Sequence, residues 1–233
     1  MAHLSELLLK AHETRTQFAS AQAEAPKDIG EVYRIHDAVY ASLAKGARPV
    51  AWKVGGASAE VEPTIAPILP GRVFASPTTA RGSDFHVIGV EAEVAFEFTN
   101  NEWALHVVIE LCDARMSDWK TAPALMKLAD NQMNWGLVVG SGTADWQRID
   151  FGTQPAELWV GGKQVVSMKG GHPYGNPFRL VEWTSKHLAP RTGAVREGDV
   201  ITTGSWGGMH FASPGDEVVA RFPGIGEAVA RIS

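Results

Sequence analysis

The sequence predicts an α+β fold in which helices come first along the chain and a sheet follows. Two observations support this prediction. Residues 2–24 are rich in Ala, Leu and Glu, whereas the chain after residue 50 consists of short β-prone segments separated by glycine and proline. This order differs from the regular alternation of helix and strand in a parallel βαβ protein. A chain of 233 residues, 45% of them hydrophobic and 20% charged, is long enough to fill one large core.

Two helices are expected before residue 50. Within residues 2–24, apolar side chains recur at helical spacing at Leu4, Leu7, Leu8 and Ala11. Asp28 fits the N-cap of a second helix that ends near Lys45. Both apolar stripes are typical of helices that simply pack on a core, so no functional residue is assigned to them.

The β-prone segments follow one another along the rest of the chain. Strands are expected at residues 50–56, 72–75, 88–98, 104–111, 135–139, 200–203, 217–222 and 228–232. Residues 158–166 predict a β-hairpin, because Gly161-Gly162 supplies the positive φ angles of a tight turn. Further helices are expected at residues 121–129 and 178–188.

The composition excludes several classes of function. Asp and Glu number 26 against 21 Lys and Arg, and no segment concentrates basic residues, so nucleic acid is not an expected partner. The single cysteine, Cys112, excludes an internal disulfide and a cysteine-based zinc cluster. Residues 1–7 lack the regions of a signal peptide, and no apolar run reaches the roughly 20 residues that span a bilayer. We therefore expect a cytoplasmic protein with no membrane partner.

Two glutamates, Glu91 and Glu93, lie on one face of the expected strand 88–98. The other face is apolar and carries Val90, Ala92, Val94, Phe96 and Phe98. Carboxylates two residues apart on a strand repel each other unless they face water or share a cation. For these two residues alone, an edge strand with a solvated acidic face is the simpler interpretation.

A third glutamate makes a solvated edge strand the less favoured of these two interpretations. Glu110 interrupts the apolar segment Val107-Val108-Ile109-Glu110-Leu111, where a lone carboxylate would be costly without a partner. Three glutamates and water molecules form a hard oxygen site that suits Mg²⁺ or Mn²⁺ better than zinc. We therefore favour a metal site formed by Glu91, Glu93 and Glu110.

Lys53 is a second candidate, because it lies between Trp52 and Val54 at a strand end that two glycines follow. A partly desolvated lysine can bind a substrate carboxylate or act as an acid or base. A lysine whose stem covers apolar neighbours while its ammonium group reaches water explains the local sequence equally well.

The segment Thr202-Thr203-Gly204-Ser205 is a third candidate, since hydroxyl groups and backbone N–H groups at a strand end can bind an oxyanion. A structural turn is the simpler interpretation of this motif. His106 shares a strand face with Glu110 and could support it, whereas His172 and His210 are isolated and are interpreted as structural or surface residues.

Taken in order, these motifs resemble the fumarylacetoacetate hydrolase superfamily, and within it the branch of 2-oxopent-4-enoate hydratases and 4-oxalocrotonate decarboxylases. The resemblance covers most of the chain. The matching segments are 51–55, 89–96, 109–115, Asp130-Asn131, 175–177 with Trp183, and 198–205.

The resemblance implies a mixed β-roll with N-terminal helices, in which residues 1–48 form a helical segment packed on a catalytic unit of residues 49–233. It also implies a homo-oligomer. Mg²⁺ or Mn²⁺ would be held by Glu91, Glu93 and Glu110, and Lys53, Gly204 and Ser205 would bind the substrate, with catalytic roles for Lys53 and Ser205.

The implied substrate is a small 2-oxo acid, a 2-hydroxy-2,4-dienoate or its tautomer, from the catabolism of aromatic compounds. We expect a hydratase (lyase) that adds water to it. A decarboxylase or acylpyruvate hydrolase of the same superfamily, and a non-catalytic 2-oxo-acid-binding homologue, remain alternatives. Ser76 stands where the family carries an acid thought to transfer protons, and we expect this position to lie near the pocket.

Overall fold

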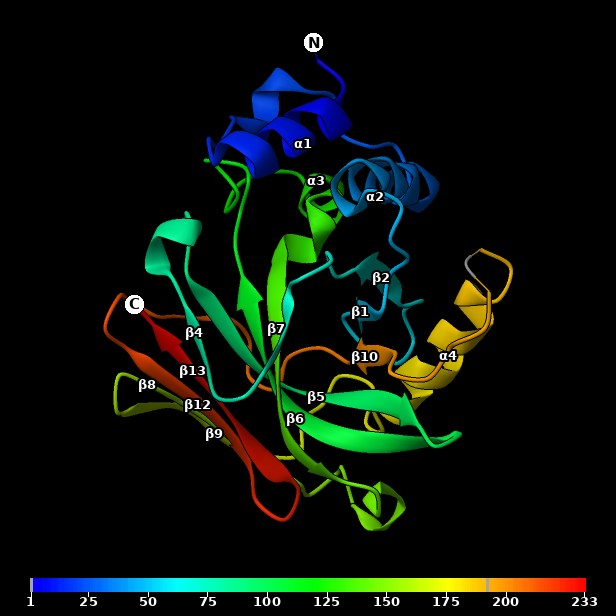
Figure 1. The fold of residues 1–233 in the computed structure, drawn as a ribbon, viewed down its shortest axis with the longest axis vertical. Helices are drawn as coiled ribbons and strands as arrows, with labels where there is room; N and C mark the ends of the chain where they lie inside the picture. The colour runs from blue at the N-terminus through cyan, green and yellow to red at the C-terminus, as the bar shows by residue number, and fades with distance from the viewer. Residues whose placement is uncertain (1, 192) are drawn as a thin grey trace.

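Two curled β-sheets pack against each other, and three of the four α-helices gather at one end of them (Figure 1). The structure is a computed structural model that describes residues 2–191 and 193–233. The α-helices are α1 (Leu4–Thr14), α2 (Ile29–Ala44), α3 (Ala124–Ala129) and α4 (Phe178–Leu188). Short 3₁₀ turns lie at Ser20–Gln22, Gly82–Asp84, Asn131–Met133 and Trp146–Arg148.

The larger sheet has the strand order β2-β1-β10-β5-β6-β7-β3, and β11 pairs with β5 beside this path. Its strands are β1 (Ala51–Gly55), β2 (Thr64–Pro67), β3 (Val73–Ala75), β5 (Gly89–Thr99), β6 (Glu102–Cys112), β7 (Asn134–Thr143), β10 (Val200–Thr202) and β11 (His210–Phe211). The second sheet has the order β4-β13-β12-β8-β9. It contains β4 (Thr78–Ala80), β8 (Pro155–Val160), β9 (Lys163–Lys169), β12 (Glu217–Phe222) and β13 (Gly226–Ile232).

The α+β class and the mixed β-roll with N-terminal helices are confirmed. The apolar face of β5 packs against the second sheet. Val90, Ala92, Val94 and Phe96 are buried in one core with residues of β8, β12 and β13. The same strand alternation leaves the glutamates on the opposite face. The hydrophobic periodicity therefore predicted correctly which face of this strand carries the carboxylates.

The structure corrects two local expectations. Helix α1 ends at Thr14, well before residue 24, because Arg15 adopts the left-handed conformation (φ 53°), and Phe18 then forms a β-bridge with Met116. An edge position for the Glu91–Glu93 strand is wrong, since β5 lies between β10 and β6. The short strands β4 and β11 carry too few residues to produce a periodic pattern.

The N-terminal helices form a second apolar cluster with α3. Leu4, Leu8 and Ala11 of α1 and Val32, Ile35 and Val39 of α2 pack with Met116, Ala122 and Met126. Asp28 caps α2 as expected, because its carboxylate accepts a hydrogen bond of 2.8 Å from the Glu31 N–H. The division into a 1–48 segment and a 49–233 unit stays a prediction. No helix in the described ranges has the length and apolar character that a membrane crossing requires.

Candidate metal centre and substrate pocket

The pairing of β5 with β6 places the three glutamates on one face of two neighbouring strands. Glu91 and Glu110 occupy directly opposite positions in this antiparallel pair, and Glu93 lies two residues further along the same face of β5. Opposite residues of such a pair have Cβ atoms about 5 Å apart. Glu93 and Glu110 are fully buried, whereas 13% of the Glu91 side chain is exposed.

Lys53 reaches the glutamates across a curled sheet. On a flat sheet β1 would lie three strand spacings, about 14 Å, from β6. The Lys53 Nζ nevertheless forms an ion pair with Glu110 and lies 3.4 Å from Oε2 of Glu91. The concave side of the larger sheet therefore collects all four charged groups.

Neighbouring residues fix the orientation of the buried carboxylates. Oε1 of Glu110 accepts a hydrogen bond of 2.8 Å from the Asn134 side-chain amide. Oε2 of Glu93 accepts hydrogen bonds from the Thr202 hydroxyl and, at 3.0 Å, from the Gly204 N–H. Oε1 of Glu93 has no hydrogen-bond partner among the described residues, so one oxygen of a fully buried carboxylate is free to bind a ligand.

The charge of this cluster is not balanced by its own residues. Burial raises the pKa of Glu93 and raises the pKa of Glu110 well above its ordinary value. Burial disfavours the Lys53 ammonium group, but the adjacent Glu110 and Glu91 carboxylates outweigh it and raise the pKa of Lys53 well above its ordinary value. One ammonium group thus faces three carboxyl groups. The missing positive charge and the unpartnered oxygen of Glu93 both fit a divalent cation.

Cys112 is a neighbour that sequence reasoning did not connect with the site. One ligand atom each of Glu91, Glu110 and Cys112 lies within 4.8 Å of the other two. Burial raises the pKa of the Cys112 thiol well above its ordinary value, so the sulfur keeps its proton. A protonated thiol is a poor ligand for a hard cation. Glu93 is not part of this close group, so its place as third ligand rests on its chemistry and on the resemblance.

A pocket of about 410 Å³ opens beside Lys53 and Glu91. Its volume lies in the range of small-molecule sites. Its remaining walls come from four parts of the chain, which contribute Gly55, Gly56 and Thr64; Lys127, Leu128, Gln132 and Met133; Pro173 and Tyr174; and Thr203, Gly204 and Ser205. The Ser205 Oγ is buried and has no hydrogen-bond partner within the described residues. Gly204 has a φ of 94°, which allows its N–H to turn toward Glu93.

One wall of the pocket is a left-handed turn. Asn131, Gln132 and Met133 have φ angles of 52°, 54° and 62°, a conformation that costs about 1–2 kcal/mol for each residue with a side chain. Hydrogen bonds hold the turn: the Asn131 amide donates to the Pro67 carbonyl at 3.0 Å, and the Gln132 amide donates to the Thr64 hydroxyl at 3.3 Å. Strained backbone of this kind is concentrated at functional sites.

Residues 103–233, more than half of the chain, match the family described as fumarylacetoacetate (FAA) hydrolase C-terminal. The chain belongs to this family. Glu110 and Ser205 lie inside the matched region, and Lys53, Glu91 and Glu93 precede it.

Two curated relatives show the level of similarity. The chain is 26% identical to 4-oxalocrotonate decarboxylase of Pseudomonas putida over 123 residues, which make up 53% of this chain and 46% of that protein. It is 26% identical to 2-hydroxyhexa-2,4-dienoate hydratase of Comamonas testosteroni over 117 residues, 50% of this chain and 44% of that protein. The alignments thus span about half the length of these relatives.

Solved structures of fumarylacetoacetate hydrolase relatives establish the fold over nearly the whole chain. The 4-oxalocrotonate decarboxylase from Pseudomonas putida, complexed with magnesium and adipate, has a TM-score of 0.84 at 20% identity and covers 99% of this chain and 96% of that one. The fumarylpyruvate hydrolase from Pseudomonas aeruginosa, in complex with Mn²⁺ and pyruvate, has a TM-score of 0.53 at 14% identity, with coverages of 78% and 88%.

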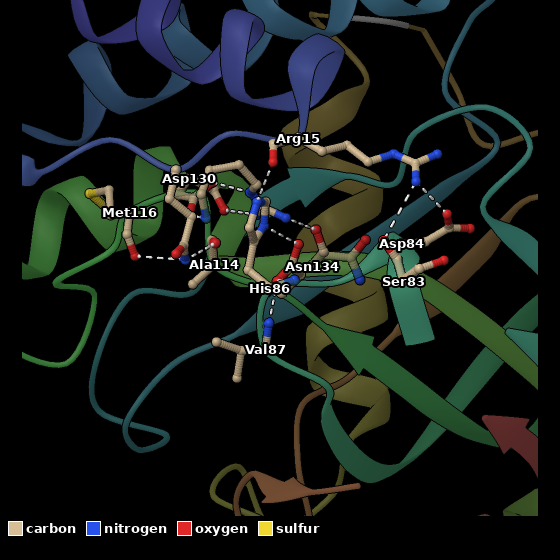
Figure 2. A network of polar contacts seen from close by, with 12 residues as sticks. Arg15, Ser83, Asp84, His86, Val87, Ala114, Met116, Asp130 and Asn134 are labelled. Carbon is tan, nitrogen blue, oxygen red and sulfur yellow. Dashed lines mark hydrogen bonds and ion pairs between the residues drawn. The ribbon is translucent and has the colours of Figure 1, made fainter. Parts of the chain in front are cut away.

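Behind the pocket of this family member, a buried ion pair supports both the turn and Glu110. Arg115 pairs with Asp130, and its guanidinium group also donates to the Asp130 carbonyl at 2.6 Å and to the Asn134 carbonyl at 3.1 Å. Figure 2 shows Asp130 and Asn134 within this polar network. Asp130 and Asn134 flank the left-handed turn, and Asn134 in turn holds Glu110. The resemblance included Arg115 and Asp130, but no local pattern connected Asn134 with Glu110.

Two expected neighbours of the site lie elsewhere. His106 is four residues from Glu110 on the same strand, about 14 Å away along it, and its Nε2 lies 3.2 Å from Glu97. Ser76 is not among the residues that line the pocket. Its hydroxyl instead accepts a hydrogen bond of 2.8 Å from the N–H of Val229 in β13. The expectation that Ser76 lies near the pocket is therefore wrong.

Sequence reasoning missed several pocket residues. Thr64, Lys127, Gln132 and Tyr174 come from strand β2, helix α3, a 3₁₀ turn and a loop, and only the fold brings them to one place. His172 was interpreted as a structural residue. It is buried, its Nε2 donates to the Thr203 carbonyl at 2.9 Å, and its Nδ1 accepts from the Tyr174 N–H at 3.2 Å.

Proposed function

We propose that this chain is a divalent-metal-dependent lyase that adds water to a 2-hydroxy-2,4-dienoate or its 2-oxo-4-enoate tautomer. The observation that carries the proposal is the charge imbalance at Glu91, Glu93 and Glu110. Among the described residues, Lys53 is the one cation that pairs with these carboxyls, and one oxygen of the fully buried Glu93 has no hydrogen-bond partner. The adjoining 410 Å³ pocket is large enough for a small acid.

In this proposal Glu91, Glu93 and Glu110 hold Mg²⁺ or Mn²⁺. Structures of relatives that contain magnesium or Mn²⁺ support this choice, as does the all-oxygen ligand set. A bound divalent ion would supply Lewis-acid chemistry, withdrawing electrons from the 2-oxo group of a substrate.

The chain's own residues have separate roles in the proposal. Lys53 lines the pocket beside Glu91, so its protonated Nζ can bind an anionic substrate group and hold a proton next to it. The buried Oγ of Ser205, which also lines the pocket, has no hydrogen-bond partner among the described residues and is available to a substrate.

A second candidate, decarboxylation of a 2-oxo diacid, is favoured by Lys127. This lysine lines the same pocket, is half-buried and forms no ion pair among the described residues. A second cation in the pocket would neutralise the second carboxylate of a diacid, which a monoacid substrate lacks. The chain is 26% identical to both the decarboxylase and the hydratase, so sequence identity does not separate the two reactions.

The proposal is tested with the purified protein and two substrates, 2-hydroxypenta-2,4-dienoate and 4-oxalocrotonate. A decrease in dienol absorbance that occurs only with Mg²⁺, and that the Glu93→Gln variant does not catalyse, supports the hydratase. Release of CO₂ from the diacid supports the decarboxylase. Thermal stabilisation by pyruvate without turnover of either compound would instead indicate a non-catalytic binding protein. The homo-oligomeric state, which the resemblance implies, and the cytoplasmic location, which the composition suggests, stay predictions.

A further inference from the structure

A small polar cavity, of about 40 Å³, lies between the end of α1, the segment that leads into β3 and the start of β7. Arg15, Arg72 and Arg115 line it together with His12 and His86. The cavity shares no residue with the 410 Å³ pocket beside Lys53. Three arginines thus meet at one small cavity in a chain whose net charge is −5.

The two carboxylates that line this cavity already have partners. Asp84 pairs with Arg15 at 2.9 Å. Asp113 accepts two hydrogen bonds of 2.9 Å from backbone N–H groups, and its other oxygen lies 3.2 Å from Nδ1 of His86. Figure 2 shows the Arg15–Asp84 pair and His86 in one network. Neither carboxylate is therefore left over for a further cation.

Arg72 is the arginine in this wall that has no such partner. Its guanidinium group forms no hydrogen bond or ion pair with the residues that the structure describes. Its Cζ lies 3.7 Å from the centroid of the Trp135 ring, and Trp135 in turn packs on Phe85 with ring centroids 4.2 Å apart. Stacking on an aromatic ring fixes the plane of a guanidinium group and leaves the N–H donors at its edge free.

The charge of Arg72 lies among the charges of the cavity wall. Burial lowers the pKa of Arg72, and the ionised groups that act on it next are Asp84, Arg115, Arg15 and Asp113, all of which line the cavity. Arginine nevertheless keeps its proton in proteins. A fixed positive charge with unused donors therefore belongs to this cavity.

The electrostatic environment of the cavity favours negative charge. The pKa of His12 falls from 6.5 to about 3, first through burial and then through the charges of Arg115, Arg72 and His86. Both ring nitrogens of His86 face oxygen acceptors, an arrangement that a protonated imidazole satisfies. The groups that act on His12 are all cations, so an anion is stabilised at the place where a second proton on His12 is not.

The volume of the cavity limits the size of the anion. One water molecule needs roughly 10–15 Å³ of such space, so 40 Å³ holds about three or four heavy atoms. Formate and bicarbonate fit this limit, whereas the five heavy atoms of sulfate or phosphate exceed it. A guanidinium group also prefers planar oxyanions, which accept two parallel N–H···O hydrogen bonds from it.

We propose that the cavity formed by Arg15, Arg72 and Arg115 binds a small planar oxyanion of the size of formate or bicarbonate. Arg72 supplies the free donors, and the other two arginines add positive charge around them. The inference does not depend on the proposed lyase activity, because the site contains none of the three glutamates and no residue of the 410 Å³ pocket.

The test titrates the purified protein with ¹³C-formate and ¹³C-bicarbonate by NMR, at constant ionic strength because salt screens exposed charges. Both anions should bind saturably, with dissociation constants of about a millimolar, since three or four heavy atoms supply little binding free energy. Sulfate, added as a competitor, should not displace formate. Equal binding of sulfate and formate, or no saturable binding of formate and bicarbonate, would overturn the proposal.

Arg72→Met removes the guanidinium group and keeps an apolar stem on Trp135. It should weaken formate binding at least about tenfold. The matched control Arg148→Met removes an exposed arginine outside the cavity and should bind formate as the wild type does. Wild-type affinity in Arg72→Met would contradict the proposal.

Two further variants distinguish this cavity from the candidate metal centre and its pocket. Glu93→Gln and Lys127→Met should both bind formate with wild-type affinity, because neither residue lines the cavity. A loss of formate binding in either variant that Arg72→Met does not show would place the anion in the 410 Å³ pocket and contradict the proposal.

Arg15→Met tests the same cavity if Arg72→Met does not fold. The Arg15 side chain is 58% exposed, so its removal leaves the core intact. The substitution removes one cation and separates Asp84 from its closest positive partner, and it should therefore weaken formate binding about two- to fivefold. Unchanged or tighter binding of formate in Arg15→Met would count against the proposal.

Discussion

Asn134 donates a hydrogen bond of 2.8 Å from its side-chain amide to Oε1 of Glu110, and its backbone carbonyl accepts one of 3.1 Å from Arg115. One residue therefore joins the buried Arg115–Asp130 ion pair to the carboxylate that faces Lys53. Outer partners of this type orient the groups that bind a metal ion.

Asn134→Ala should weaken the binding of Mg²⁺ or Mn²⁺ by about 10–100-fold, because Glu110 loses the donor that orients it. Calorimetric titration of the metal-free protein measures this effect. Gln164→Ala, an amide deletion on the exposed strand β9, is the control and should leave metal affinity unchanged. Equal metal affinity in Asn134→Ala and the wild type would show that the hydrogen bond does not position a ligand.

Glu93→Gln should reduce metal affinity by more than the roughly 10–100-fold expected for Asn134→Ala, because it removes the charge of a proposed ligand and not only a group that orients one. The metal-free variant should be as stable as the wild type or more so, because one buried, raised-pKa carboxyl is neutralised. Glu97→Gln is the matched control, on the same face of β5 but paired with His106 at the surface. A large loss of stability in Glu93→Gln without metal would indicate a structural role instead.

Lys53→Met should lower turnover of the dienoate at least a hundredfold while metal affinity stays equal or rises. The reason is that Lys53 is the ammonium group that competes with a cation for Glu91 and Glu110. Steady-state kinetics and calorimetry on the same preparation separate the two effects. Unchanged kinetics would reject the role of Lys53, and a parallel loss of metal binding would make it a part of the metal centre.

Lys127→Met should raise KM for a 2-oxo diacid about tenfold and leave KM for the corresponding monoacid unchanged, because only the diacid presents a second carboxylate to this cation. Lys120→Met removes a lysine that lies over Trp119 outside the pocket and should affect neither substrate. If turnover is absent, the same comparison is made with the binding of adipate and hexanoate. An equal change for the diacid and the monoacid would contradict this role.

His172 should make the folded protein sensitive to acid. Burial lowers the pKa of His172 from 6.5 to about 4, so the unfolded chain takes up this proton at a higher pH than the folded one. The contribution of neutral His172 to the free energy of unfolding is therefore fully present above pH 6.5 and is lost as the pH falls toward 4. Between pH 7 and pH 5 the free energy of unfolding should fall by about 2 kcal/mol. Urea unfolding at these two pH values should show a smaller difference in His172→Gln, while His3→Gln, an exposed control, should match the wild type.

Much of the fold could be predicted from local patterns. The alternation along residues 88–98 assigned Glu91 and Glu93 to one face, Asp28 marked the start of α2, and Gly161-Gly162 marked the β8–β9 turn. These features depend on neighbours within a few residues along the chain. They are consequently visible in the sequence without knowledge of the fold.

The candidate site could be predicted only in part. Its charged residues stood out because glutamates and a lysine are unusual in apolar strands, and the resemblance grouped them. The pocket walls at Thr64, Gln132 and Tyr174, and the support of Glu110 by Asn134, follow from contacts between distant segments. A turn with three left-handed residues also has no reliable local pattern when it contains no glycine.

The sequence by itself determined which side chains share a strand face, because strand geometry alternates with a period of two residues. Only the tertiary structure decided that β5 is a central strand, that Glu91 lies opposite Glu110, and that β1 curls far enough for Lys53 to reach both. The physical reason is that register and curvature arise from strand pairing and from the packing of two sheets, which involve residues far apart in the chain.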